Sequence, residues 1–182
     1  SAYSKFINLF SQPACTAGYA ISGFASQNYG AKQYDRIKSG VKICLGIATV
    51  CYIVFGSCMV FIPEILASLM LSGEEAISLT VKYFIPSGIM CFAVDYLFVF
   101  RSAVQGMGKP LVPMISGIAE MVIRVGVVFL LIEKIGFMAI IYAQIAAWVG
   151  AFIMNSLAYV FYIRKATVNS KPELEIYADD VK

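Results

Sequence analysis

Long stretches without any charged residue recur along this chain, and they constrain its fold more than any other feature. Two of them, Ile43–Ile62 and Ile135–Ile163, contain no Asp, Glu, Lys or Arg. Each is as long as the roughly 20 helical residues that the apolar core of a bilayer requires. A first segment, Phe6–Tyr29, is also uncharged but less hydrophobic. Shorter uncharged runs lie at Tyr83–Val94, Leu111–Ala119 and Val125–Ile132. The sequence therefore predicts an all-α, polytopic transmembrane helix bundle with five membrane helices, at about 6–29, 41–62, 74–105, 110–132 and 136–163.

The composition excludes an ordinary soluble domain. The chain of 182 residues is 60% hydrophobic and only 14% charged. Soluble domains contain about 45–50% apolar and about 25% charged residues. The formal net charge of +3 is small, and the chain has no basic run next to exposed aromatic residues. We therefore predict no nucleic-acid binding.

No motif of enzymatic chemistry is evident. The chain has no His, the usual proton shuttle and commonest transition-metal ligand, and it shows no nucleophile–base, phosphate-loop or metal-ligand spacing. Three cysteines recur every seven residues, and neighbours in this row lie about 10 Å apart on a helix, too far for a disulfide. We expect a protein that is not an enzyme and has no cofactor, with the cysteines acting as small packing residues. They are Cys44, Cys51 and Cys58.

Positive charges alternate along the chain in a way that predicts orientation. They gather after the first, third and fifth predicted helices, whereas the other connections are mainly acidic. Basic connections favour the cytoplasmic side of a membrane. The first, third and fifth helices should thus run from outside to inside, and 166–182 should form a cytoplasmic polar tail. The cations that decide this are Lys32, Arg36, Lys38, Lys42, Arg101, Lys109, Arg164, Lys165 and Lys171. The other connections contain Glu64, Glu74, Glu75 and Glu133, and their only cations are Lys82 and Lys134.

Three charged residues fall at membrane depth: Asp95, Glu120 and Arg124. Intramembrane charges usually face a bundle interior or a water-filled cavity, where they act in transport or pair with one another. Arg124 follows Glu120 by four residues, so the two share a helix face and can form a salt bridge that only fixes packing. Asp95 has no partner on its own helix and is the stronger candidate for an ion or substrate site. Its alternative is a structural pairing with Arg124 across two helices.

Three motifs in a fixed order carry a resemblance to a known family. Residues 18–32 read GYAISGFASQNYGAK, 101–110 read RSAVQGMGKP and 117–124 read GIAEMVIR. They are similar to the sQnyGAk helix end, the R-x-x-lQG-x-G loop and the sGi-x-E-x-x-x-R helix of multidrug and toxic compound extrusion (MATE) transporters. The likeness extends over nearly the whole chain, about 12–164.

The resemblance implies more than the residues alone do. Members of the family have twelve helices in two six-helix lobes around a central cleft, and they export cationic or amphipathic organic compounds in exchange for Na⁺ or H⁺. The five helices here would be the eighth to twelfth, so that 1–165 form a partial C-terminal lobe. The N-terminal lobe and the seventh helix would then be missing partners, alongside membrane lipids and small-molecule organic substrates. Asp95 lies on the tenth helix and is the candidate for a Na⁺ site.

These implications leave alternatives open. Because the chain begins at Ser1 and reaches an apolar segment at once, we expect it to be part of a longer protein. The expected location is the plasma membrane of a bacterium. Two functions compete with drug export. The chain could belong to a lipid-linked oligosaccharide flippase of the same superfamily, or be a membrane interaction fragment that does not transport. The coupling ion, Na⁺ or H⁺, stays undecided.

Overall fold

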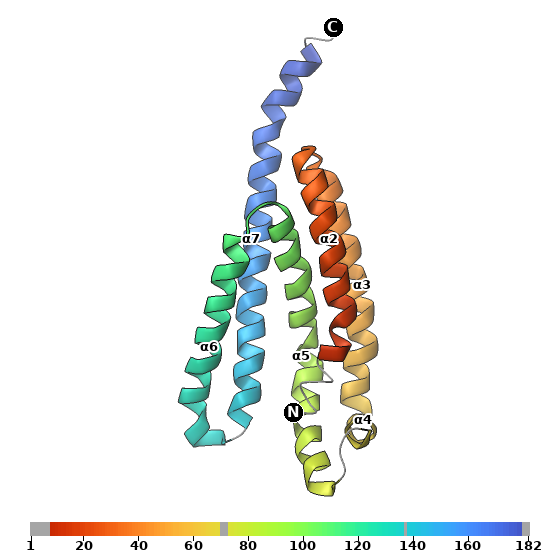
Figure 1. Ribbon diagram of the computed structural model, residues 1–182, viewed down its shortest axis with the longest axis vertical. Helices are drawn as coiled ribbons and strands as arrows, with labels where there is room; N and C mark the ends of the chain where they lie inside the picture. Colours follow the sequence, from red (N-terminus) through yellow and green to blue (C-terminus); the bar gives the residue numbers. More distant parts are fainter. Residues whose placement is uncertain (1–7, 70–72, 137, 180–182) are drawn as a thin grey trace.

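The computed structural model describes residues 8–69, 73–136 and 138–179 (Figure 1). These residues are almost entirely helical, and the described part contains no strand, as the apolar runs predict. A bundle of long, nearly antiparallel helices results. The helices are α2 (Gln12–Gly30), α3 (Tyr34–Phe61), the short α4 (Pro63–Ser68), α5 (Glu74–Gly106), α6 (Leu111–Ile135) and α7 (Met138–Asp179).

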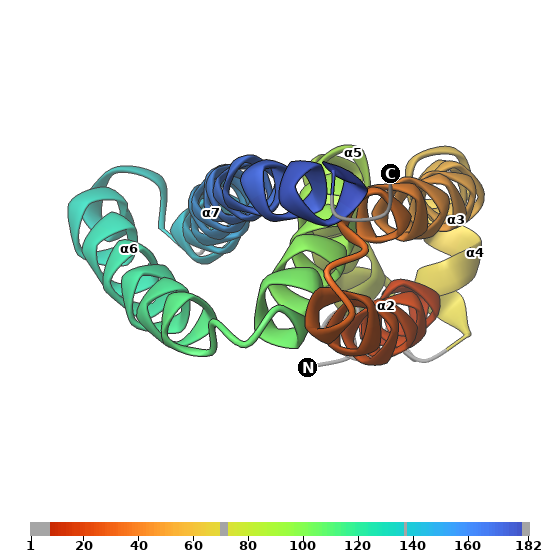
Figure 2. The ribbon, with the colours of Figure 1, turned by 90° about the horizontal axis from the view of Figure 1, so that it is seen from above.

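Helix α5 is the central element of the bundle. It packs against α2 and α3 on one side and α7 on the other, while α6 contacts mainly α7. Seen from above, α5 lies between the α2–α3 pair and the α6–α7 pair (Figure 2). Buried residues therefore occur on all sides of α5, whereas α6 buries only Ser116 fully.

Small residues set the closest approaches to α5. The carbonyl oxygen of Ser22 on α2 lies directly against Gly106, so that no side-chain carbon fits there. On α3, a Cβ added to Gly56 would lie 3.1 Å from the carbonyl oxygen of Gly88. Such contacts are typical of helix pairs in lipid, which associate by close packing instead of by the hydrophobic effect. They hold α2 and α3 against α5 at both ends of the bundle.

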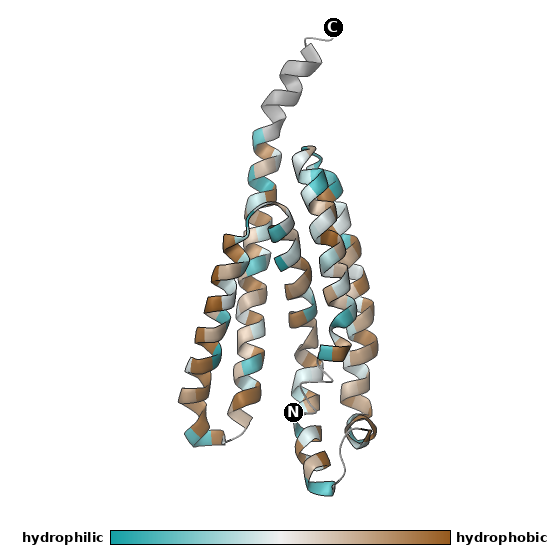
Figure 3. Ribbon diagram, in the orientation of Figure 1, coloured by the Kyte–Doolittle hydropathy of each residue, from teal (hydrophilic) through white to brown (hydrophobic). Residues whose placement is uncertain are grey.

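The number of apolar spans differs from the predicted five. In the described residues, α3, α5, α6 and α7 are long and apolar enough to cross a membrane, and α2 is not among them. Helix α2 corresponds to the predicted span 6–29, of which the residues before 8 lie outside the described chain. Its amide and hydroxyl side chains lower its hydropathy, and Figure 3 shows them as teal and white bands. Among the described residues, four helices and not five meet the length and composition of a membrane span.

Two helix bounds also differ from the predicted segments. Helix α3 begins at Tyr34, seven residues before the predicted 41, because the connection after α2 takes only residues 31–33. Helix α7 does not end near Ile163 but continues to Asp179, into the segment predicted as a polar tail. Helical structure there follows from the absence of Gly and Pro between Ile163 and Lys171.

The connections that carry the cations lie at one end of the bundle. The α2–α3 turn, the α5–α6 turn and the last part of α7 are all at the top of Figure 1, and the other connections are at the bottom. Lys109 in the α5–α6 turn lies with its Nζ 5.7 Å from the ring centre of Tyr162 on α7. Gly108, with φ of 74°, makes that turn possible. One end of the molecule is thus basic.

Candidate functional site

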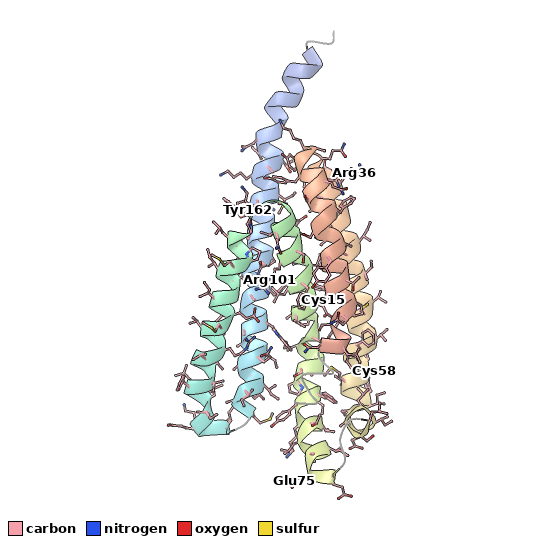
Figure 4. All side chains as sticks on the ribbon, in the orientation of Figure 1. Cys15, Arg36, Cys58, Glu75, Arg101 and Tyr162 are labelled. Carbon is pink, nitrogen blue, oxygen red and sulfur yellow. The ribbon has the colours of Figure 1, made fainter. Side chains whose placement is uncertain are left out.

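Asp95 lies in the middle of α5 and is one of the most completely buried polar residues. Its exposed fraction is 1%. It shares a helix face with Cys91, one turn earlier, and faces α2 at Ser11 and Cys15, whose side chains interact with it. Because α5 is covered by helices on both sides, the carboxylate on this face has almost no exposed surface. Figure 4 labels Cys15 on α2.

The polar atoms around Asp95 are not satisfied. Asp95 Oδ1 and Ser11 Oγ are both buried and have no well-formed hydrogen bond, although the Ser11 hydroxyl lies close enough to interact with the carboxylate. In the described part of the chain, no cationic side chain lies within ion-pair distance of Asp95. Buried polar groups normally have partners, and an unpaired one needs an explanation. The arrangement places two buried oxygen atoms, neither with a well-formed hydrogen bond, close together between α2 and α5.

Helix α2 presents an unusual surface next to this carboxylate. Its exposed residues recur at spacings of three and four, so they share one face of the helix. This face is uncharged but largely polar, unlike the outward faces of α3 and α6, which are apolar (Figure 3). We call it the polar face of α2; it consists of Gln12, Thr16, Tyr19, Ala20, Gly23, Ser26, Gln27 and Gly30.

The polar face and the buried carboxylate are neighbours. Gln12 is exposed on α2, and the preceding residue, Ser11, is buried beside Asp95. Thr16 Oγ1 donates a hydrogen bond to the Gln12 carbonyl oxygen at 3.0 Å, which satisfies the hydroxyl within the helix. Amides and hydroxyls are unfavourable against lipid chains. A face of this composition suits water or another polar protein surface.

Glu120 and Arg124 form the predicted ion pair on α6. The distance from Arg124 Nη2 to Glu120 Oε1 is 2.8 Å. A third residue, which the sequence interpretation missed, joins them: Arg101 Nη2 on α5 lies 3.7 Å from Glu120 Oε2 and donates to the Pro113 carbonyl oxygen at 3.4 Å. The described cluster thus holds one carboxylate between two guanidinium groups, with a net charge of +1.

The alternative pairing of Asp95 with Arg124 is not formed. Arg124 is engaged by Glu120, and α6 touches α5 only slightly. Asp95 instead faces α2, away from the α6 cluster. The three predicted site residues therefore belong to two separate places, a buried carboxylate at α2–α5 and a charged cluster at α5–α6.

One buried polar contact had no sequence signal strong enough to single it out. Asn155 on α7 donates from Nδ2 to Ser116 Oγ on α6 at 2.6 Å and to the Ala151 carbonyl oxygen at 2.8 Å. Both side chains are fully buried, and Asn155 Oδ1 has no partner. A single Asn in an apolar helix is common, and only its neighbour across the helix pair makes it distinctive. It joins α6 to α7.

Comparison with known families decides the identity of the chain. The MatE family matches residues 1–130, from the N-terminus through most of α6. The chain belongs to the MatE family. It is therefore a multi-pass membrane protein and a membrane transporter of the MATE kind, in a family whose members are transporters and not enzymes. No curated protein matches the chain.

Proposed function

We propose that the MatE chain is part of a secondary active antiporter that exports cationic or amphipathic organic compounds in exchange for Na⁺ or H⁺. One observation carries the proposal: a buried carboxylate without a cationic partner, Asp95, lies directly behind the polar face of α2. A carboxylate at this depth is stable when it is protonated, hydrated or compensated by a cation. The coupling ion and a cationic substrate both meet that requirement.

Competition for the same carboxylate explains exchange. If Asp95 holds a proton or Na⁺, its charge is neutralised and a cationic substrate is released. If the substrate takes that place, the ion leaves. The polar face of α2 supplies a surface that water can wet on the helix that covers the carboxylate. Alternating access requires a second lobe that moves against the first. We therefore propose that an N-terminal lobe and a seventh helix, which this chain does not contain, complete the transporter.

The residues around Asp95 fit Na⁺ as well as H⁺. Among the described residues, Ser11 Oγ and Asp95 Oδ1 are buried oxygens without well-formed hydrogen bonds, and hard cations bind oxygen ligands. A proton would need only Asp95. Na⁺ would need further oxygens, from the backbone, from water or from the missing helices. Both coupling ions therefore stay within the proposal.

We propose that the ion pair of Glu120 and Arg124 holds α6 in place, and that this pair rearranges during the transport cycle. Their ion pair, with Arg101, lies where α6 meets α5, and α6 is otherwise attached through α7. Direct substrate contact at Glu120 is the competing role. The two roles separate by mutation, since a packing role changes folded yield and a substrate role changes export with yield intact.

Sidedness follows from the basic end. We propose that the α2–α3 turn and the end of α7 face the cytoplasm of a bacterial cell, because the cations cluster there. A single cysteine replacing Gln33, in a cysteine-free background, should react with an impermeant maleimide only after the cells are opened. Labelling of intact cells from outside would reverse the orientation.

The proposed site is tested by Asp95→Asn in the complete transporter. This change keeps the shape of the side chain and removes its charge. We expect normal expression, at least a tenfold loss of export in proteoliposomes, and a weaker response to imposed Na⁺ or H⁺ gradients, since about 1.4 kcal/mol of lost interaction gives a factor of ten. Glu133→Gln is the matched control, because Glu133 is exposed at the end of α6. Wild-type export with unchanged ion dependence would remove Asp95 from the mechanism, and transfer of a lipid-linked sugar would favour the flippase alternative.

A further inference from the structure

A groove runs between α2 and α3 at the basic end of the bundle, away from Asp95. Its volume is about 530 Å³, and its walls are mainly apolar, with Ala20 and Phe24 from α2 and Ile43 and Cys44 from α3. The charged residues Asp35 and Arg36 also line it. Gly40 forms its floor, because a Cβ there would lie 2.8 Å from the Phe24 ring and 3.0 Å from Ile21. A side chain at position 40 would therefore require Phe24 and Ile21 to move, and the groove would change shape.

The mouth of the groove carries a positive charge. Arg36, in the first turn of α3, lies with its guanidinium carbon 5.8 Å from the Phe24 ring centre and donates from Nη1 to Gln33 Oε1 at 3.0 Å. Within the described chain it has no acidic partner, because neighbouring Asp35 is paired with Lys38 at 2.8 Å. The N-terminal end of α3 adds a positive helix dipole at the same place. Arg36 is thus held in position while its charge stays available (Figure 4).

The groove is continuous with a surface suited to lipid chains. Ile43 lines the groove and is 64% exposed, and Ile47 and Val50 extend the same helix face with 47% and 62% exposure. The spacing of four and three residues places all three on one stripe of α3. An occupant of this groove would meet a guanidinium at one end and an uninterrupted apolar stripe at the other.

We infer that the α2–α3 groove binds a phospholipid with an anionic headgroup, with the phosphate at Arg36 and an acyl chain along Ile43 and the α3 stripe. Charge complementarity favours this occupant: residues 32–38 carry Lys32, Arg36 and Lys38 against Asp35 alone. Basic pockets between membrane helices on the cytoplasmic side are suited to anionic headgroups. The inference requires only that the chain spans a membrane, and it is independent of the proposed export reaction.

Native mass spectrometry of the purified complete protein tests the site. The detergent-solubilised protein is incubated with dioleoylphosphatidylglycerol or with dioleoylphosphatidylcholine, and retained lipid is counted. Arg36→Gln should weaken retention of dioleoylphosphatidylglycerol about fivefold, as expected for the loss of one cation at a lipid headgroup. Ala20→Phe, which fills the groove without changing charge, should weaken it too. Lys42→Gln is the matched control, since Lys42 is exposed on the same helix but does not line the groove.

The outcomes are distinguishable. Stronger retention of phosphatidylglycerol that falls in both groove variants and not in the control supports the site. Equal retention of the two lipids, or wild-type retention in Arg36→Gln, overturns the proposed lipid site. Such results would be found if another part of the protein covers the groove. Displacement by millimolar glycerol 3-phosphate would identify a soluble phosphate ester as the occupant and also overturn it. All variants change exposed or half-exposed side chains, and a size-exclusion profile verifies that they fold.

Discussion

Replacing Glu120 by Gln should damage the fold more than replacing either of its arginine partners. The carboxylate lies 2.8 Å from Arg124 and 3.7 Å from Arg101. At an effective dielectric constant of about 20, these separations correspond to gross attractions of about 6 and about 4.5 kcal/mol, before desolvation is subtracted. Glu120→Gln removes both and leaves two guanidinium groups beside each other without a counter-charge.

The net effect is smaller because the cluster is partly solvated. The side chains of Arg101, Glu120 and Arg124 are 27%, 17% and 38% exposed. Removing one partner of a fully buried ion pair lowers the free energy of unfolding by about 3–5 kcal/mol. Because this cluster is partly exposed, we expect a loss of about 2 kcal/mol for Glu120→Gln. Arg124→Gln should lose less than about 1 kcal/mol, since Arg101 still compensates Glu120. The double variant leaves only Arg101, close to the end of α5, and should fall between the two.

Thermal unfolding followed by fluorescence-detected size-exclusion chromatography measures this order. A loss of about 2 kcal/mol should lower the apparent melting temperature by about 4–8 °C for a chain of this size. Arg101→Gln serves as the matched control, because it leaves the closer Glu120–Arg124 pair intact. Equal losses in Glu120→Gln and Arg124→Gln would show that Arg101 does not compensate the carboxylate. Additive losses in the double variant would show that the residues act independently.

Three further results are expected. Gly106→Ala should destabilise the protein by about 1–3 kcal/mol because the new methyl group meets the Ser22 carbonyl oxygen, whereas Gly23→Ala, with no atom nearby, should leave the melting temperature unchanged or slightly raised. Asn155→Ala should lower stability by about 0.5–2 kcal/mol, as measured by melting temperature, because it removes the hydrogen bond to Ser116; an unchanged value would show that this bond does not hold α6 to α7. Expressed alone in an exporter-deficient host, the chain should give no drug efflux, because alternating access needs two lobes; robust efflux would contradict the proposed two-lobe arrangement.

The sequence was sufficient for the helices that are apolar on most sides. Uncharged runs such as Ile43–Ile62 and Ile135–Ile163 predict α3 and α7 because no other fold buries so many apolar residues in succession. The same rule fails for α2, since a helix with one polar face has low average hydropathy even when its other faces are packed. Average hydropathy does not record which side of a helix is polar.

The candidate site was predictable in its parts but not in its grouping. Asp95 and the spacing of Glu120 and Arg124 can be read from the chain, because charges stand out in an apolar helix and four residues make one turn. Arg101 was assigned to a connection, since it lies five residues before the end of α5. Only the approach of α6 to α5 shows that its side chain reaches back to Glu120. Contacts between helices depend on rotation about their axes, which a single sequence does not fix.

The polar face of α2 also has a consequence for how the protein enters the membrane. During synthesis α2 leaves the ribosome before α3 and α5, the two helices that cover its other sides. A segment with so many amides and hydroxyls gains little by moving from the translocon into lipid alone. Its neighbour α3 is apolar enough to insert, and only residues 31–33 separate the two. Helix α2 should therefore be retained at the translocon until α3 arrives and enter the bilayer as one half of a helical hairpin.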